Sequence, residues 1–213
     1  MLALGIDTAT GDLVVGVGDV DKQQALAESI TETRAHNERL MPAVQAVLAA
    51  AGVDFGDLDA VVVGCGPGPF TGLRVGMASA SALGQALGVP VHGVVTHDAV
   101  AAQIEADRVL VVTDARRREV YWAHYERGRR VAGPGVCAPG AVPVERADVV
   151  SVPPHLAGQL EVEAGQVRHV SPNTLGLLRA ADFSTEPSPL VPQYLRRPDA
   201  VEPKGKPTSP AIP

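Results

Sequence analysis

The chain has 213 residues, of which 46% are hydrophobic and 20% charged, and its formal net charge is −6 at pH 7. This length is enough for one large domain or two small ones, with a core of aliphatic residues because aromatic residues make up only 3%. The negative charge argues against an electrostatic grip on nucleic acid along the whole chain, although it is compatible with a local basic patch.

The N-terminus and the cysteines indicate a soluble cytoplasmic protein without a membrane anchor. No basic segment precedes Asp7, as it would in a secretory signal peptide. No apolar run reaches the roughly 20 residues that a membrane-spanning helix needs. Cys65 and Cys137 lie far apart and form no metal-binding pair, which suits a reducing compartment. We interpret both cysteines as small buried hydrophobic residues.

Strands and helices alternate in the first half. A polar turn, DTATGD, joins the first two apolar strands as a β-hairpin, and apolar residues later recur at helical spacing. Pro42 marks either the start of a helix or a bend in it, and Gly52 ends that helix. This order predicts a mostly parallel sheet with an antiparallel hairpin at one end. The predicted elements are strands over residues 2–6, 13–17, 24–31, 58–66 and 89–95 and helices over about residues 37–51 and 72–87.

The second half begins like the first. A shift of about 107 residues places Asp7 on Asp114 and Asp12 on Glu119. Each copy then consists of an apolar strand, a polar turn and a second strand. The similarity indicates an internal duplication, although two unrelated hairpins can align equally well.

The rest of the second half is less regular. Short strands are predicted over residues 147–152 and 167–172, and a helix over residues 173–182 is capped by Ser171 or Asn173. We expect three segments, of which the last is proline-rich and disordered. They are an N-terminal α/β half of residues 1–102 with partner-binding helices, a smaller and irregular C-terminal α/β half of residues 103–200, and a tail of residues 201–213.

Residues 61–76, VVVGCGPGPFTGLRVG, join a strand to a helix through a turn rich in glycine and proline. Such turns often bind phosphate, but neither the P-loop pattern nor the dinucleotide pattern G-x-G-x-x-G fits this spacing of glycines. Pro67 and Pro69 also lack the amide donors that a phosphate cradle uses. We interpret the loop as a rigid elbow.

A stripe of small residues follows the elbow: Gly72, Gly76, Ala80 and Gly84 are spaced by four. Glycine inside a helix costs roughly 1 kcal/mol relative to alanine, so another backbone must offset it by coming very close. Two interpretations are open. The stripe packs on the protein's own sheet, or it is a flat face for a helix of another protein, assisted by the neighbouring helix around Met41.

Two roles are open for Asp7, which follows the first strand beside Thr8. It holds a hydrated metal near a nucleotide phosphate, or it accepts hydrogen bonds from amides of its own turn; the turn is favoured, and Asp114 is interpreted in the same way. The six histidines offer no i, i+3 or i, i+4 pair for zinc, and there is no G-x-S-x-G elbow. Basic runs at residues 116–118, 127–130 and 196–197 are solvated hairpin tips or contacts to an anionic partner such as tRNA.

Five segments, in order and spacing, resemble the bacterial TsaB family, also called YeaZ. The resemblance covers nearly all of residues 1–200, and the motif G-P-G-x-F-T-G-L-R with D-A-R-R-x-E-V-Y is highly specific. Pro69 is a minor departure, since family members often have serine there. The segments are LALGIDTAT, RAHNERLMPAVQAVLAAAG, LDAVVVGCGPGPFTGLRVGMASASALGQALGVPVHGV, TDARRREVYWAHY and PQYLR.

The resemblance implies the α/β fold of the actin-like, sugar-kinase and Hsp70 ATPases, in the ribonuclease H-like class. Two related halves each open with a β-hairpin. The family is related to the catalytic subunit TsaD, which places a metal through two histidines four residues apart. In register with that relative, the two positions are Thr96 and Val100, and His97 is one residue off. The resemblance therefore implies a pseudoenzyme without catalytic or metal-binding residues of its own.

The resemblance also implies partners. TsaB is the dimerisation subunit of the complex that makes threonylcarbamoyladenosine next to the anticodon of tRNA, and it pairs with TsaD through two helices of its N-terminal half. The complex also recruits the ATPase TsaE and receives threonylcarbamoyl-adenylate from a separate enzyme. We expect a homodimer through the same face in isolation. The expected interface residues are Asn37, Leu40, Met41, Val44, Phe70, Thr71, Gly72, Arg74, Val75, Gly76, Ala80 and Gly84.

No cofactor is expected to bind tightly to this chain alone. Asp7 and Thr8 are the candidate nucleotide contacts, and an adenine nucleotide is compatible with the interface of the complex. An alternative function is a stand-alone nucleotide-dependent phosphotransferase or hydrolase that uses Asp7 and the cleft between the halves, which rests on fold class alone. A peptidase activity, attached to relatives of this fold, is supported by no metal pair or nucleophile in the sequence.

Overall fold

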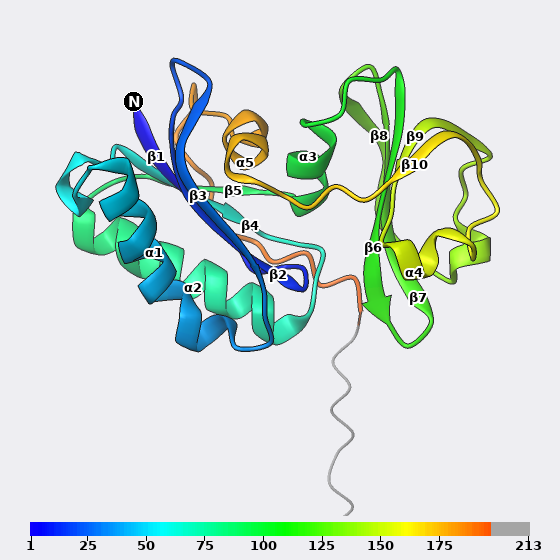
Figure 1. Cartoon of the computed structure of the whole chain (residues 1–213), viewed down its shortest axis with the longest axis horizontal. Coiled ribbons are helices and arrows are strands. Elements are labelled where there is room, and N and C mark those ends of the chain that lie inside the picture. Colours follow the sequence, from blue (N-terminus) through cyan, green and yellow to red (C-terminus); the bar gives the residue numbers. More distant parts are fainter. Residues whose placement is uncertain (197–213) are drawn as a thin grey trace, which may run out of the picture.

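The computed structural model describes residues 1–196, which form two five-stranded sheets with two short helices between them (Figure 1). These helices are α3 (Thr96–Ala101) and α5 (Thr174–Ala180). The predicted tail of residues 201–213 lies outside the described residues. No helix in the described part of the chain has the length and hydrophobicity needed to cross a lipid bilayer.

The first sheet is formed by residues 2–94 and confirms the predicted hairpin and third strand. Its strands are β1 (Leu2–Asp7), β2 (Asp12–Asp19), β3 (Gln24–Glu32), β4 (Ala60–Gly64) and β5 (Val91–Val94). Their order is β3-β2-β1-β4-β5, with antiparallel pairing from β3 to β1 and parallel pairing from β1 to β5. β4 is buried throughout, as expected for a valine run in the middle of a sheet that is covered on both faces.

The second sheet repeats this topology. Its strands are β6 (Arg108–Arg116), β7 (Glu119–Glu126), β8 (Arg129–Cys137), β9 (Arg146–Ser151) and β10 (Glu163–Arg168). The order β8-β7-β6-β9-β10 again combines an antiparallel meander with two parallel strands. Two α/β halves that each open with a hairpin are thereby confirmed. The strand predicted over residues 167–172 lies earlier, because Glu163–Arg168 is the segment that pairs with β9.

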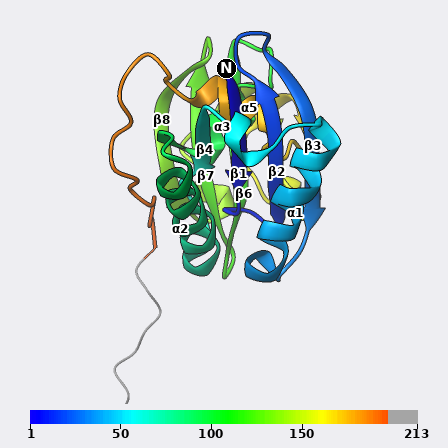
Figure 2. The same cartoon turned by 90° about the vertical axis from the view of Figure 1, so that its left-hand side faces the viewer.

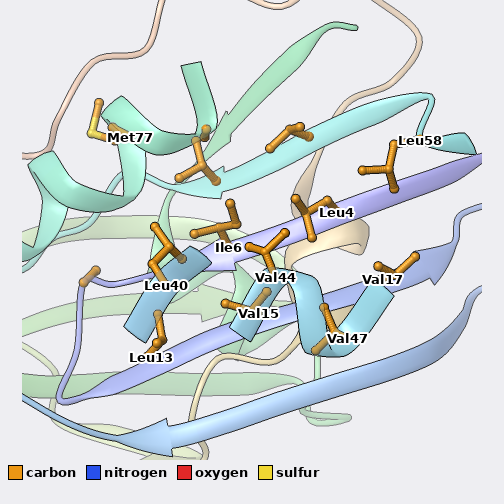
Figure 3. Close-up of a cluster of buried hydrophobic side chains, with 14 of the residues drawn as sticks. Leu4, Ile6, Leu13, Val15, Val17, Leu40, Val44, Val47, Leu58 and Met77 are labelled. Atoms are coloured by element: carbon orange, nitrogen blue, oxygen red, sulfur yellow. The ribbon is translucent and has the colours of Figure 1, made fainter. Parts of the chain in front are cut away.

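Two long helices cover one face of the first sheet and lie side by side (Figure 2). α1 (His36–Ala51) begins six residues before Pro42, so the helix does not start at the proline, and Gly52 ends it with φ of 69°. α2 (Phe70–Leu87) starts directly after the glycine–proline loop. Aliphatic side chains of α1 pack between those of β1 and β2 in the core (Figure 3). The core residues labelled there come from β1, β2, α1, α2 and the segment before β4: Leu4, Ile6, Leu13, Val15, Val17, Leu40, Val44, Val47, Leu58 and Met77.

The C-terminal part of the chain returns to the first half. Asn173 caps α5, as one of the two expected caps, through a 2.7 Å hydrogen bond from the Gly176 amide to its side chain. Leu177 and Leu178 of α5 pack against strands of the first sheet. The predicted division at residue 102 lies between the two sheets in the chain. However, α5 comes after this division and packs on the first sheet, so the domain boundaries stay a prediction.

Residues 182–196, called the C-terminal strap below, run from α5 past α2 to the second half. The Gln193 amide donates to the Cys65 carbonyl oxygen at 2.8 Å. Arg196 reaches the second half, where its guanidinium donates to the Ala115 carbonyl oxygen and lies 2.9 Å from a Glu119 carboxylate oxygen. The strap therefore links the two halves at the end of the β6–β7 hairpin.

Candidate functional site

A cleft of about 1050 Å³ lies between the two halves. The starts of α1 and α2 line one wall, and the turn between β6 and β7 with the short helix α4 (Pro154–Ala157) lines the other. Charged and titratable side chains gather on both walls. They are Glu32, Arg34 and His36 on the first wall and Asp114, Arg116, Arg117, Arg118, Glu119 and His155 on the second.

The basic run at residues 116–118 forms the turn of the β6–β7 hairpin. All three arginines have positive φ, at 61°, 54° and 63°, and all three are exposed. Asp114 holds this turn, because its carboxylate accepts a 2.6 Å hydrogen bond from the Arg116 amide. His155 lies across from it, with Nε2 3.5 Å from Asp114 Oδ2. The predicted turn role of Asp114 is therefore confirmed.

Asp7, the equivalent residue of the first half, is completely buried. Its carboxylate accepts hydrogen bonds of 2.7 Å from the Ala9 amide and the Thr96 hydroxyl. Burial raises the pKa of Asp7 to about 6, against the opposing effect of these two donors. Gly64 packs against the carboxylate so closely that a Cβ there would overlap it. Asp7 caps its own turn, as favoured from the sequence, and does not line the cleft, so the proposed metal or nucleotide contact lacks access.

Thr8 is also buried and is likewise removed from the cleft. Its hydroxyl donates a 2.7 Å hydrogen bond to the Gly72 carbonyl oxygen in the first turn of α2. Gly68 approaches the Ala9 backbone so closely that no side chain fits between them. The glycine–proline loop therefore packs directly on the β1–β2 turn, which agrees with a stiff elbow that sets the start of α2.

The small-residue stripe packs on the protein's own sheet, so its interpretation as an outward face for another protein is wrong. A Cβ on Gly76 would overlap the Thr8 hydroxyl, and a Cβ on Gly84 would overlap the side chain of Val91 in β5. Ala80 is fully buried. The close approach of the chain to itself is therefore what offsets the cost of glycine within α2.

The expected interface residues divide accordingly. Leu40 and Val44 of α1 are core residues, because the helix turns its aliphatic side toward β1 and β2. Gly72 is half-buried against the Thr8 carbonyl oxygen, and Val75 is half-buried. The residues that face outward are Asn37, Met41, Phe70, Thr71 and Arg74.

Apart from Met41, sequence reasoning missed the residues that form the exposed side of the helix pair, called the outer helical face below. Most are alanines, and their exposure leaves short side chains over two adjacent helices. The signal was present in the sequence as alanines spaced by four residues on α2, each two positions after a residue of the stripe. The face comprises Met41, Pro42, Ala46, Ala49 and Ala50 of α1 and Ala78, Ala82 and Ala86 of α2.

His97 is buried at the junction of the two halves. Its Nε2 lies 2.9 Å from the Thr113 hydroxyl of β6, whereas its Nδ1 has no hydrogen-bond partner among residues 1–196. Burial lowers the pKa of His97 to about 3, with a smaller contribution from the Arg130 charge, so the ring is neutral. Among residues 1–196, no group of three or more histidine, cysteine or acidic side chains is arranged to hold a metal ion.

Both cysteines are free, and they differ in exposure. Cys65 is buried, as expected, and burial raises the pKa of its thiol to about 11. Cys137 is only partly buried, so the expectation of a buried residue holds for it in part.

Comparisons with a family model, with sequences and with solved structures find related proteins. Residues 24–184 match the family model described as TsaD, tRNA N6-adenosine threonylcarbamoyltransferase. An uncharacterized protein of Mycobacterium tuberculosis strain H37Rv is 51% identical over 198 residues, which cover 92% of each chain. The tRNA threonylcarbamoyladenosine biosynthesis protein TsaB of Escherichia coli K12 is 38% identical over 131 residues, which cover 60% of this chain and 56% of that protein.

A solved structure has the same fold. YeaZ from Pseudomonas aeruginosa superposes with a TM-score of 0.72 at 28% sequence identity. The superposition covers 84% of this chain and 89% of that one, so it includes both halves.

Proposed function

From the premise that the chain belongs to the TsaB (YeaZ) family, within the proteins matched by the TsaD model, we propose that it acts in the biosynthesis of threonylcarbamoyladenosine in tRNA. Its role is that of a non-catalytic subunit that binds TsaD. The substrate is the adenosine next to the anticodon, and TsaE and tRNA join the complex.

The outer helical face is the observation that carries this proposal. Its alanines leave the backbones of α1 and α2 open to close approach by another helix, and no described segment of the chain covers them (Figure 2). Met41 adds a large apolar side chain, 39% exposed, to the alanines of this face. Apolar surface without charge is what a stable subunit interface buries. TsaD, the related chain of the same complex, is the proposed occupant.

The non-catalytic role is supported by the sealed first turn. Asp7 is enclosed by Gly64, Thr96 and the Ala9 amide, so a substrate in the cleft has no access to its carboxylate. The positions in register with the metal-binding histidines of TsaD are Thr96 and Val100, which both lie buried in α3. In this arrangement TsaD supplies the reacting groups, and this chain supplies a surface.

A charge placed on the outer helical face tests the proposal. Ala82→Arg is expected to weaken TsaD binding at least about tenfold, because an interface must bury the guanidinium. The unfolding free energy is expected to change by less than about 0.5 kcal/mol, since residue 82 is exposed. Isothermal titration calorimetry with TsaD measures the first effect, and urea denaturation measures the second.

Val131→Arg is the matched control, because Val131 is 53% exposed on β8 of the other half. We expect the control to bind TsaD like the wild type. Equal affinity of the Ala82→Arg variant and the wild type would contradict docking on this face.

The same face accounts for self-association of the isolated chain. Without TsaD, its apolar surface stays in water, and pairing with a second copy removes it from water. Light scattering is expected to detect a homodimer at high concentration, and Ala82→Arg is expected to shift the mass toward that of a monomer. A strict monomer of the wild type would exclude this part of the proposal.

A further inference from the structure

The cleft carries arginines that the described chain does not neutralise. Its acidic groups mostly have partners already: Asp114 accepts from the Arg116 amide and faces His155, and Glu119 pairs with Arg196. Glu32 is the cleft carboxylate without an ion pair among residues 1–196. The guanidinium groups of Arg34, Arg116 and Arg118 likewise have no ion pair within the described part of the chain.

The conformation of the hairpin turn decides how these charges point. Arg116 ends β6 and Arg117 and Arg118 form the turn, all with positive φ, so their side chains leave the backbone in different directions. Their guanidinium groups therefore do not converge on a single small anion. They suit several negative charges spaced along a chain, and Arg34 on the opposite wall adds a further contact.

The remaining lining indicates what kind of chain fits. Among residues 1–196, no tryptophan, tyrosine or phenylalanine lines the cleft, so its only rings for base stacking are the smaller imidazoles of His36 and His155. Arginine and the open amides of the first turn of α2 are donors for phosphate oxygens. The arginines and amides therefore make the site better suited to a sugar–phosphate backbone than to bases.

We propose that the backbone of the tRNA substrate runs along this cleft and that Arg34, Arg116 and Arg118 contact its phosphates. The inference rests on the proposed function, because RNA is the polyanion of that reaction. It also has a spatial basis: His36, Asn37, Thr71 and Val75, at the starts of α1 and α2, line the cleft. RNA held there lies next to the ends of the helices on which TsaD docks.

The test compares arginines of two hairpin turns. Asparagine tolerates positive φ, so Arg116→Asn with Arg118→Asn removes two charges without straining the turn. Arg127→Asn is the matched control, since Arg127 has φ of 49° in the β7–β8 turn, at the other end of β7. Each variant is purified with TsaD, and binding of an end-labelled, unmodified tRNA transcript is measured by fluorescence anisotropy over a series of salt concentrations.

The double variant is expected to bind the transcript about tenfold more weakly at low salt. The slope of log K against log salt is expected to fall by roughly 1.5, because each lost phosphate contact contributes roughly 0.7 to 0.9. Arg127→Asn is expected to stay within about twofold of the wild type. This combination of results supports the inference.

Other outcomes overturn it. Equal affinities of the double variant and the control exclude the cleft as an RNA site. Loss of TsaD binding in the double variant assigns the arginines to a protein partner, and displacement of the transcript by stoichiometric pyrophosphate assigns the cleft to a small anion. An active complex with unchanged RNA affinity in the double variant contradicts this inference alone, whereas a wild-type complex that leaves the transcript unmodified contradicts the proposed function.

Discussion

The two halves of the molecule have the same strand order but different coverings. In the first half, α1 of 16 residues and α2 of 18 residues connect β3, β4 and β5. In the second half, the equivalent connections contain a 3-10 turn (Pro139–Ala141) and α4, which has only four residues. The difference teaches that a repeated sheet does not repeat its surface, because the connections between the strands decide what is covered.

The aspartates that end the first strand of each half illustrate the consequence. Both accept a hydrogen bond from the amide two residues ahead, so the carboxylate makes the same local contact in each half. Asp7 is buried because the elbow and α2 pack over its turn, whereas Asp114 stays exposed at the cleft because α4 is too short to cover it. One half presents an exposed helical face, and the other presents charged side chains at the cleft.

The largest effect is expected from a substitution that disturbs the packing of α2 on the first half. Gly76→Leu is expected to cost about 3 kcal/mol of unfolding free energy or to prevent folding, since the Thr8 hydroxyl occupies the space of the new side chain. Urea denaturation measures the loss. Ala78→Leu, two residues away on the exposed side of α2, is the control and is expected to change stability by less than about 0.5 kcal/mol. Similar stabilities of the two variants would refute the inward orientation of the stripe.

A smaller effect separates the two aspartates by pH. The pKa of Asp7 is raised to about 6, so between about pH 4 and 6 the folded state holds a proton that the unfolded state has lost. The contribution of Asp7 to stability therefore falls as pH rises through this range. Asp7→Asn is expected to gain on the order of 2 kcal/mol relative to the wild type between pH 4 and pH 7.

Urea denaturation at several pH values measures this gain. The lowered pKa of His97 acts in the opposite direction, because the unfolded state binds a proton below about pH 6.5 that the folded state does not. That contribution is common to the wild type and the variant, and it cancels in their difference. Asp114→Asn makes the same exchange in the exposed turn of the other half and serves as the control. A difference between wild type and Asp7→Asn that does not change with pH would contradict the prediction.

The smallest effect concerns the link between the halves. Arg196→Ala removes the ion pair with Glu119. The side chain of Arg196 is 26% exposed and that of Glu119 is 38% exposed, so the variant is expected to lose only about 0.5 kcal/mol of unfolding free energy. Faster hydrogen exchange of the Gln193 amide is the sharper measurement, because that amide bonds to Cys65 within the strap contact. Arg168→Ala, an exposed arginine on β10, is the control. Unchanged exchange at Gln193 would show that the strap holds without Arg196.

Local patterns predicted the fold better than the site. Alternating apolar strands, the DTATGD turn and the spacing of Asp7 and Asp114 predicted the hairpins and the repeated half, because hydrogen bonds within a turn and burial of a strand depend mainly on nearby residues. The grouping of the small residues on one side of α2 was predicted correctly, but the interpretation that this side faces another protein was wrong. Four-residue spacing defines one side of a helix but does not say which side meets the sheet.

The sequence by itself determined the elements of this protein, the duplication of its halves and its family, since these follow from local patterning and from motifs read in order. Only the tertiary structure decided that Gly76 faces Thr8, that Asp7 is enclosed and that Arg34 and Arg118 face a common cleft. These relations join residues far apart in the chain, and contacts of that kind depend on how the elements pack.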